Sequence, residues 1–232
     1  MSENGKMEER RGEVIMKIFV IGANGQIGKH LTTLIKEDNK HTVRAMVRTE
    51  EQASTFEKTG IETALVNLED SVEHIADAAA GCDAIVFTAG SGGSTGADKT
   101  LLIDLDGAVK AMEAAEQAGI KRFIMVSALQ ANNRENWSSV IKPYYVAKHY
   151  ADRILMESPL NYTIIRPGGL TNDKGTGKIR AEKNITSGPR TIAREDVAKT
   201  ILASLEEEKT YRLAFDVISG EKSIETALQS IN

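Results

Sequence analysis

Cysteine and long apolar runs are both scarce in this sequence of 232 residues. The single cysteine, Cys82, cannot form an intrachain disulfide, so the reducing cytoplasm is the expected setting. No apolar run approaches the roughly 18 residues that a membrane span needs, and the first residues are charged where a signal peptide would be apolar. We therefore expect a cytoplasmic protein that does not contact a membrane.

An excess of positive charge is also absent. The chain has 29 Lys and Arg residues against 33 Asp and Glu residues, a net charge of -4. Proteins that neutralise nucleic-acid phosphates are usually basic, so nucleic acid is not an expected partner. The four histidines have no metal-ligand spacing, and neither H-E-x-x-H nor C-x-x-C occurs. We predict no metal site.

Short apolar runs rich in β-branched residues do occur, and helical segments alternate with them. This alternation predicts an α/β protein: a Rossmann-type doubly wound parallel sheet of about seven strands, flanked by helices, in a single domain. The predicted strands are KIFVIG (17–22), TVRAMV (42–47), IETALV (61–66), DAIVFT (83–88), RFIMVS (122–127), YTIIRP (162–167) and LAFDVI (213–218).

Two connections, residues 128–142 and 168–192, are too long for tight turns between a strand and a helix. Both follow strands, and ligands of doubly wound sheets bind beyond the carboxyl ends of the strands. We expect these loops to form a small substrate region within one domain at 16–232. Residues 1–15 have no periodicity and are expected to be a disordered extension, with Met16 as the physiological start.

The helix predicted over residues 98–118 has an apolar stripe. The stripe can face the sheet or a second copy of the chain, so a monomer and a homodimer are both compatible with the sequence. Its members are Leu101, Leu105, Ala108, Met112 and Ala115.

Three glycines, Gly22, Gly25 and Gly28, lie between the first predicted strand and the following helix. They form G-x-x-G-x-x-G, not the standard dinucleotide motif G-x-G-x-x-G. A glycine loop at the N-terminus of a helix exposes backbone N–H groups, and the helix dipole favours a pyrophosphate there. The alternative is that the glycines serve turn geometry alone.

Arg48 follows the second predicted strand, where a dinucleotide-binding protein contacts the ribose. An acidic residue would accept hydrogen bonds from the 2′-hydroxyl of NAD. A guanidinium instead suits the 2′-phosphate of NADP, so we predict NADP(H) over NAD(H). Arg44, earlier in the strand, is a weaker second candidate, and a solvated arginine is the alternative.

Ser127 ends the fifth predicted strand, and Tyr144 precedes Lys148 by four residues on the next predicted helix, where Pro143 is an early position. A tyrosine hydroxyl becomes a usable acid or base when a lysine ammonium stabilises its phenolate. We predict that Tyr144 exchanges the proton of a carbonyl or hydroxyl group, that Lys148 lowers its pKa, and that Ser127 orients the substrate oxygen. A half-buried tyrosine beside a solvated lysine is the alternative.

Taken together, the motifs GANGQIG, VRAMVR, FTAGSGGSTGADKT, IMVSA, YYVAK, YTIIRPGGLT and REDVA resemble those of the short-chain dehydrogenases/reductases. Within that superfamily the chain is similar to the atypical, single-domain NAD(P)-binding members of epimerase/dehydratase-like type. The resemblance covers nearly all of residues 16–232. It implies a nicotinamide dinucleotide that lies across the strand ends.

The resemblance also implies a role for each matching residue. It assigns the pyrophosphate to Gly22, Asn24, Gly25, Gln26, Ile27 and Gly28; the 2′-phosphate to Arg48; the adenine to Asn67 and Leu68; a ribose to Thr88, Ala89 and Gly90; the nicotinamide ribose to Lys148; and the carboxamide to Pro167, Gly168 and Gly169.

Two residues depart from the family pattern. Asp104 stands where many members carry an asparagine that assists the proton relay, and Asn67 stands where an aspartate commonly contacts adenine. The first departure puts the relay in question.

We therefore expect an NADP(H)-dependent oxidoreductase that transfers a hydride between the nicotinamide and a small carbonyl or hydroxyl substrate, or one of quinone or flavin type. The first alternative is a non-catalytic NADP-binding sensor of the nitrogen-metabolite-repressor type. The second is a sugar-nucleotide epimerase or dehydratase, ranked lower because such enzymes usually have a larger C-terminal substrate region. Residues 171–190 carry a local charge of +3, which indicates an anionic small-molecule substrate unless the charges are simply solvated.

Overall fold

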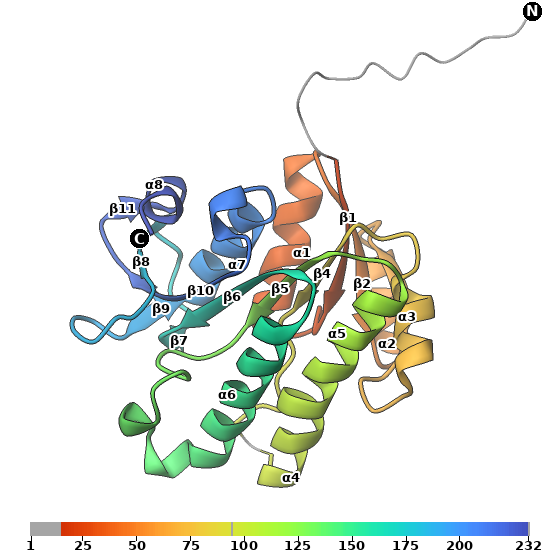
Figure 1. Ribbon diagram of the computed structural model, residues 1–232. Helices are drawn as coiled ribbons and strands as arrows, with labels where there is room; N and C mark the ends of the chain where they lie inside the picture. Colours follow the sequence, from red (N-terminus) through yellow and green to blue (C-terminus); the bar gives the residue numbers. More distant parts are fainter. Residues whose placement is uncertain (1–14, 94, 232) are drawn as a thin grey trace, which may run out of the picture.

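A nine-stranded sheet forms the centre of the part of the molecule that the structure describes (Figure 1). The structure is a computed structural model and describes residues 15–93 and 95–231. Seven adjacent strands run parallel in the order β10-β6-β5-β4-β1-β2-β3, and each coincides with one predicted apolar run. The parallel strands are β1 (Lys17–Ile21), β2 (Thr42–Val47), β3 (Glu62–Leu65), β4 (Ala84–Phe87), β5 (Arg122–Val126), β6 (Asn161–Pro167) and β10 (Leu213–Ser219).

The described main sheet has two strands beyond the predicted seven, one within residues 168–192 and one after β10. β8 (Lys178–Glu182) pairs antiparallel with β10, and β11 (Lys222–Ser223) pairs with β8. β7 (Gly169–Thr171) and β9 (Thr191–Ala193) form a separate two-stranded parallel sheet. These four strands are short, and those of the main sheet carry charged residues, so a search for apolar runs misses them.

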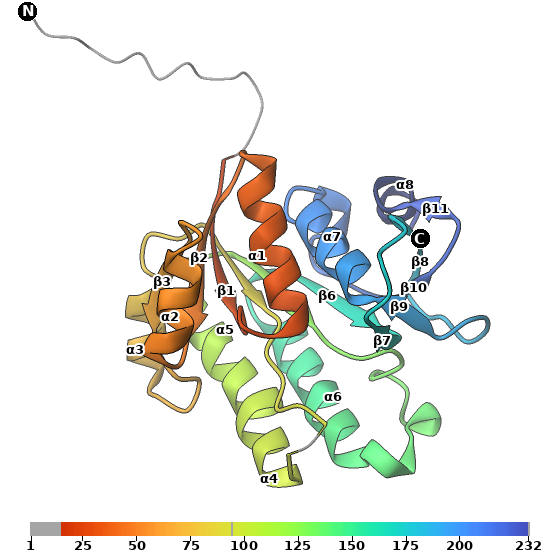
Figure 2. The ribbon, with the colours of Figure 1, turned by 180° about the vertical axis from the view of Figure 1, so that it is seen from behind.

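Helices cover both faces of the sheet, as Figures 1 and 2 show. Alternate residues of β1 therefore enter two cores: Ile18 and Val20 pack into one, and Phe19 and Ile21 into the other. The first core contains residues of α1 (Gln26–Asp38), α2 (Glu50–Glu57), α7 (Arg194–Ser204) and α8 (Ile224–Gln229); the second contains residues of α3 (Val72–Ala79), α5 (Gly107–Gln117) and α6 (Lys142–Glu157).

The helix predicted over residues 98–118 is not uniform. It consists of α4 (Ala97–Lys99), a π-helical segment η1 (Thr100–Asp106) and α5. The wider π turn changes which side chains face inward. Leu101 is 50% exposed, so it does not share a face with the rest of the predicted stripe, whereas Asp104 is fully buried. Ala108, Met112 and Ala115 are buried in the core beside the sheet, so this part of the stripe faces the sheet, one of the two options that the sequence left open.

The loop of residues 128–142 contains two short 3-10 turns, η2 (Arg134–Asn136) and η3 (Ser139–Ile141). A third, η4 (Glu208–Thr210), precedes β10. Pro143 occupies the first turn of α6, as predicted, where its missing N–H costs no helical hydrogen bond. The predicted N-terminal extension lies, apart from Ile15, outside the described residues.

No helix in residues 15–93 and 95–231 combines the length and the apolar character that crossing a membrane requires.

Candidate active site

A cavity of about 1230 Å³ runs along the carboxyl ends of the parallel strands. Pockets for one drug-sized ligand usually measure about 300–1,000 Å³, so this one has room for a dinucleotide and a second molecule. Every predicted cofactor or catalytic residue except Gly28 lines it. It crosses the point between β1 and β4 where the strand order reverses, which is where doubly wound sheets bind ligands.

The three positions before α1 are occupied by glycine for different reasons. Gly22 has φ +85°, and a Cβ there would lie 2.6 Å from the Ala89 nitrogen. A Cβ on Gly28 would overlap the Gly22 carbonyl oxygen, so this glycine serves packing and does not line the cavity. Of the three, Gly25 has the most room: a Cβ there would lie 3.1 Å from its nearest neighbour, the Gly22 carbonyl oxygen.

Gly25 is the N-cap of α1, and no side chain caps that end. The first helical residues, Gln26 and Ile27, line the cavity. The backbone N–H groups of an uncapped first turn need acceptors, and together with the helix dipole they form a site for an anion. The loop therefore fits a pyrophosphate.

Arg48 and Arg44 have opposite environments. Arg48 is exposed and lines the cavity, and within the described residues its guanidinium makes no hydrogen bond or ion pair. Arg44 instead pairs with Glu62 at 2.7 Å and donates to the Ala78 carbonyl at 2.7 Å. Arg44 thus has a structural role, and Arg48 is the guanidinium available to a phosphate.

The predicted adenine end is shaped by the turn after β3. The Asn67 side-chain oxygen accepts a hydrogen bond from the Glu69 N–H at 3.1 Å, and Leu68 is buried. Glu69 also pairs with Lys99 of α4 at 2.7 Å, and both residues line the cavity. Sequence analysis missed this pair because nothing in the sequence shows that α4 lies beside this turn.

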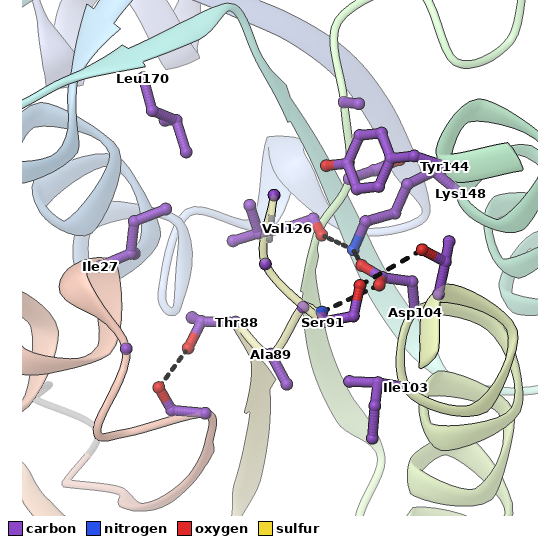
Figure 3. Close-up of a pocket in the computed structure, with 18 of the residues that line it drawn as sticks. Ile27, Thr88, Ala89, Ser91, Ile103, Asp104, Val126, Tyr144, Lys148 and Leu170 are labelled. Carbon is purple, nitrogen blue, oxygen red and sulfur yellow. Dashed lines mark hydrogen bonds and ion pairs between the residues drawn. The ribbon is translucent and has the colours of Figure 1, made fainter. Parts of the chain in front are cut away.

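Tyr144 and Lys148 lie on the cavity side of α6 (Figure 3). The Lys148 ammonium is 5.6 Å from the centre of the Tyr144 ring and donates to the Val126 carbonyl at 3.3 Å. It is 3% exposed, so its charge acts in a medium that screens it weakly. The predicted pairing of the two residues on one helix face is present.

Asp104 is the neighbour that sequence analysis left in question. Its Oδ1 lies 3.2 Å from the Lys148 Nζ, and its Oδ2 accepts the Ser91 N–H at 3.0 Å. Burial raises the pKa of Tyr144; Lys148 opposes this effect and Asp104 adds to it. Burial acts to lower the pKa of Lys148, but Tyr144 and Asp104 outweigh it and raise that pKa.

Ser127 lines the same cavity at the end of β5, and its backbone N–H donates to the Ile165 carbonyl at 2.8 Å. Its hydroxyl is buried without a hydrogen-bond partner in the described residues. The Asp152 carboxyl lies close by: burial raises its pKa, while Arg166 and Ser127 act to lower it. The Ser127 hydroxyl makes no hydrogen bond of normal geometry to that carboxyl, so it is available to a ligand atom.

Both predicted loop segments reach the cavity. Val140 and Ile141 come from the first and are 87% and 44% exposed, and Leu170 comes from the second. Arg190 and Arg194 also line it, and neither pairs with a carboxylate within the described residues.

The other charges of residues 171–190 are placed elsewhere: Arg180, for example, pairs with Glu182 at 2.6 Å. Of the charged residues in this segment, Arg190 lines the cavity. Trp137 lies outside the cavity lining and stacks on Tyr145, with ring centres 5.9 Å apart.

Gln130 joins the two loop segments, a role that sequence analysis did not find. Its side-chain nitrogen donates to the Ile185 carbonyl at 3.0 Å and to Asp216 at 2.9 Å, and its oxygen accepts from Asn136 at 2.7 Å. Gln130 has φ +62°, an uncommon conformation for a residue other than glycine. The network fixes both segments against β10.

No three His, Cys, Asp or Glu side chains within residues 15–93 and 95–231 form a group that could hold a metal ion.

A parallel doubly wound sheet, an uncapped glycine loop and a Tyr–Lys pair in one cavity define an NAD(P)-binding protein of the atypical short-chain dehydrogenase/reductase type. The NAD(P)H-binding family model matches residues 22–208, and the chain belongs to that family.

Individual relatives are similar over nearly their whole length. The chain is 62% identical over 216 residues to the uncharacterized sugar epimerase YhfK of Bacillus subtilis, which covers 93% of this chain and 100% of the relative. A solved structure from Bacillus halodurans, assigned to the NAD-dependent epimerases/dehydratases, has a TM-score of 0.87 at 40% identity and covers 92% and 99% of the two chains. The oxidoreductase ylbE of Lactococcus lactis has a TM-score of 0.83 at 33% identity, over 93% and 96%.

Proposed function

We propose that this protein is an NADP(H)-dependent oxidoreductase that transfers a hydride between the nicotinamide and a small carbonyl or hydroxyl substrate. One observation carries the proposal: the Tyr144–Lys148 pair lies in the same cavity as the glycine loop and the unpartnered Arg48. A proton-transfer pair and a phosphate-binding end in one cavity are the parts that carbonyl reduction by a dinucleotide needs.

The residues fit the dinucleotide along the length of the cavity. The first-turn N–H groups of α1 are proposed to hold the pyrophosphate, and Arg48 the 2′-phosphate through charge-assisted hydrogen bonds. Lys148 is proposed to bind the nicotinamide ribose, and the backbone at Pro167–Gly169 the carboxamide. The bound dinucleotide supplies or accepts the hydride.

Two residues of the chain are proposed to act on the substrate oxygen, Tyr144 by donating a proton and Ser127 by positioning it. In reduction, Tyr144 donates its proton to the carbonyl oxygen while the carbonyl carbon receives the hydride, and the resulting phenolate recovers a proton from solvent. The Ser127 hydroxyl, which lacks a partner in the described fold, is proposed to hold that oxygen in place.

The substrate is proposed to be a small anionic molecule with an apolar body. Arg190 and Arg194 supply cationic groups, while Val140, Ile141 and Leu170 supply exposed apolar surface in the same cavity. Apolar walls with a few placed polar groups are typical of small-molecule sites.

The direct test has two parts. The first is a fluorescence titration of the protein with NADPH and with NADH, for which we expect tighter binding of NADPH. The second is NADPH oxidation with a panel of aldehydes, ketones, quinones and flavins, some carrying carboxylates. Binding of NADPH without turnover of any panel member would favour the sensor alternative instead.

Epimerisation is a second candidate, favoured by the 62% identity to a protein named as a sugar epimerase. Interconversion of nucleotide sugars without net consumption of cofactor would support it over a reductase.

A further inference from the structure

A buried carboxylate neutralises the lysine of the proposed catalytic pair. Asp104 is fully buried and Lys148 is 3% exposed, and their charged atoms are 3.2 Å apart. In a tyrosine–lysine pair, an unopposed ammonium would favour the phenolate. Here the ammonium and the carboxylate together present little net charge to the phenol.

The position of this carboxylate is fixed from several sides (Figure 3). Asp104 belongs to the π-helical segment η1, whose wider turn brings residue 104 to the interior. The Ser91 N–H donates to its Oδ2 at 3.0 Å. A Cβ on Gly90 would lie 3.1 Å from its Oδ1, so the glycine leaves room for the carboxylate beside the lysine.

We propose that Asp104 is a positioning residue that, by holding the Lys148 ammonium, favours the protonated form of Tyr144, which is the acid of carbonyl reduction. This inference rests on the proposed function for its catalytic meaning. The protonation of Tyr144 itself depends only on the chain.

The step balances with a reduced nicotinamide as the co-reactant. The hydride and its electron pair form a C–H bond at the carbonyl carbon, the carbonyl π bond breaks, and its oxygen takes the proton from the Tyr144 Oη. The carbonyl is reduced, the nicotinamide is oxidised, and the phenolate is left to regain a proton from solvent. A tyrosine that is already protonated needs no prior proton uptake.

The groups that act on the Tyr144 phenol come from two elements. Lys148, Tyr145 and Asp152 lie on α6, and Asp104 lies on η1. Lys148 favours the phenolate, whereas the other three disfavour it. Asp104 pairs directly with Lys148, so its removal is expected to change the balance most.

The test is an ultraviolet difference titration of tyrosinate formation, recorded after rapid pH jumps so that alkaline unfolding does not interfere. The Tyr144 signal is isolated by subtracting the same titration of Tyr144→Phe. Asp104→Asn keeps the side-chain shape and removes the charge, and we expect it to lower the midpoint of Tyr144 by about one to two pH units. Asp106→Asn is the matched control, because Asp106 lies on the same segment but its exposed carboxylate pairs with Lys110. It should leave the midpoint unchanged.

Asp104→Asn leaves a buried lysine unpaired, which destabilises the fold, so a second variant tests the inference independently. Lys148→Met should raise the Tyr144 midpoint, and the double variant Asp104→Asn/Lys148→Met should lie between the two single variants. Equal midpoints in the folded wild type and Asp104→Asn, or shifts of the same sign in both single variants, would overturn the inference. Because these titrations need no cofactor or substrate, they are independent of whether NADPH binds or is oxidised, which tests the proposed function.

Discussion

The two ends of the cavity differ in whether their charged groups are paired. At the end formed by Arg48 and the first turn of α1, the proposed phosphate end, Arg48 is exposed and unpartnered among the described residues, and the helix has no side-chain cap. At the end formed by Tyr144 and Lys148, the proposed reaction end, Lys148 is buried and paired with Asp104. An unpaired cation and free N–H groups suit a charged ligand, whereas a neutralised pair suits a neutral reacting group. The contrast supports the proposed assignment of the first end to the cofactor phosphates and of the second end to proton transfer.

The largest expected effect is at the reaction end. Tyr144→Phe removes the proton donor, so we expect the rate of NADPH oxidation to fall by about a hundredfold or more, since general acids typically contribute about 10²–10⁴. The affinity for NADPH, measured by fluorescence, should change little. Tyr145→Phe is the control, because Tyr145 lines the same cavity but stacks on Trp137. Full activity in Tyr144→Phe would refute the assigned acid.

At the phosphate end, Arg48→Ala should weaken NADPH binding by about ten- to a hundredfold, the equivalent of one charged hydrogen-bonded contact of about 1.5–3 kcal/mol. NADH binding should stay nearly constant, because it lacks the 2′-phosphate. Arg44→Ala should instead lower stability and leave the ratio of the two dissociation constants unchanged, since Arg44 pairs with Glu62. A lost preference in Arg44→Ala, but not in Arg48→Ala, would reverse the assignment.

The glycines give a smaller effect that separates packing from ligand binding. Gly28→Ala places a Cβ against the Gly22 carbonyl, so we expect a loss of about 1–3 kcal/mol in the free energy of unfolding, measured with urea. Gly25→Ala should cost less, about 0.5–1 kcal/mol, because its nearest contact is 3.1 Å away and alanine is a poorer N-cap than glycine. Equal losses in the two variants would mean that Gly25 is also held by packing.

The smallest expected effect is that of pH on reduction. Burial raises the pKa of Tyr144 above its usual value near 10. The acid form that reduction needs is therefore fully present at neutral pH and is lost only as pH rises through that raised pKa. We expect the NADPH oxidation rate at saturating substrate to change little up to about pH 9, where Tyr144 is still protonated. A decline centred near neutrality would contradict this.

Sequence patterns were sufficient for the parallel part of the sheet and for most residues of the cavity. The seven parallel strands are buried on both faces, so each is an apolar run that can be recognised without knowing its neighbours. The glycine loop, Ser127, Tyr144 and Lys148 follow from their places relative to those runs, and they meet in one cavity as expected.

Two predictions failed where the local sequence carries no signal for the structure that forms. β8 and β11 are stabilised by the edge of β10, and nothing in their own short, charged sequences marks them as strands. The π turn moved Leu101 outward because a 3.6-residue period does not apply there.

Local chemistry thus determined that the chain has a glycine loop before the first helix, a guanidinium after the second strand and a tyrosine one helical turn before a lysine. Each of these features lies within a few residues of a recognisable strand or helix. Only the tertiary structure decided that Arg48 is unpartnered within the described residues while Arg44 is paired, and that Asp104 neutralises Lys148. Those outcomes arise from the packing of η1 against α6 and of β2 against β3, because the strength of a charge interaction depends on distances that sequence spacing does not give.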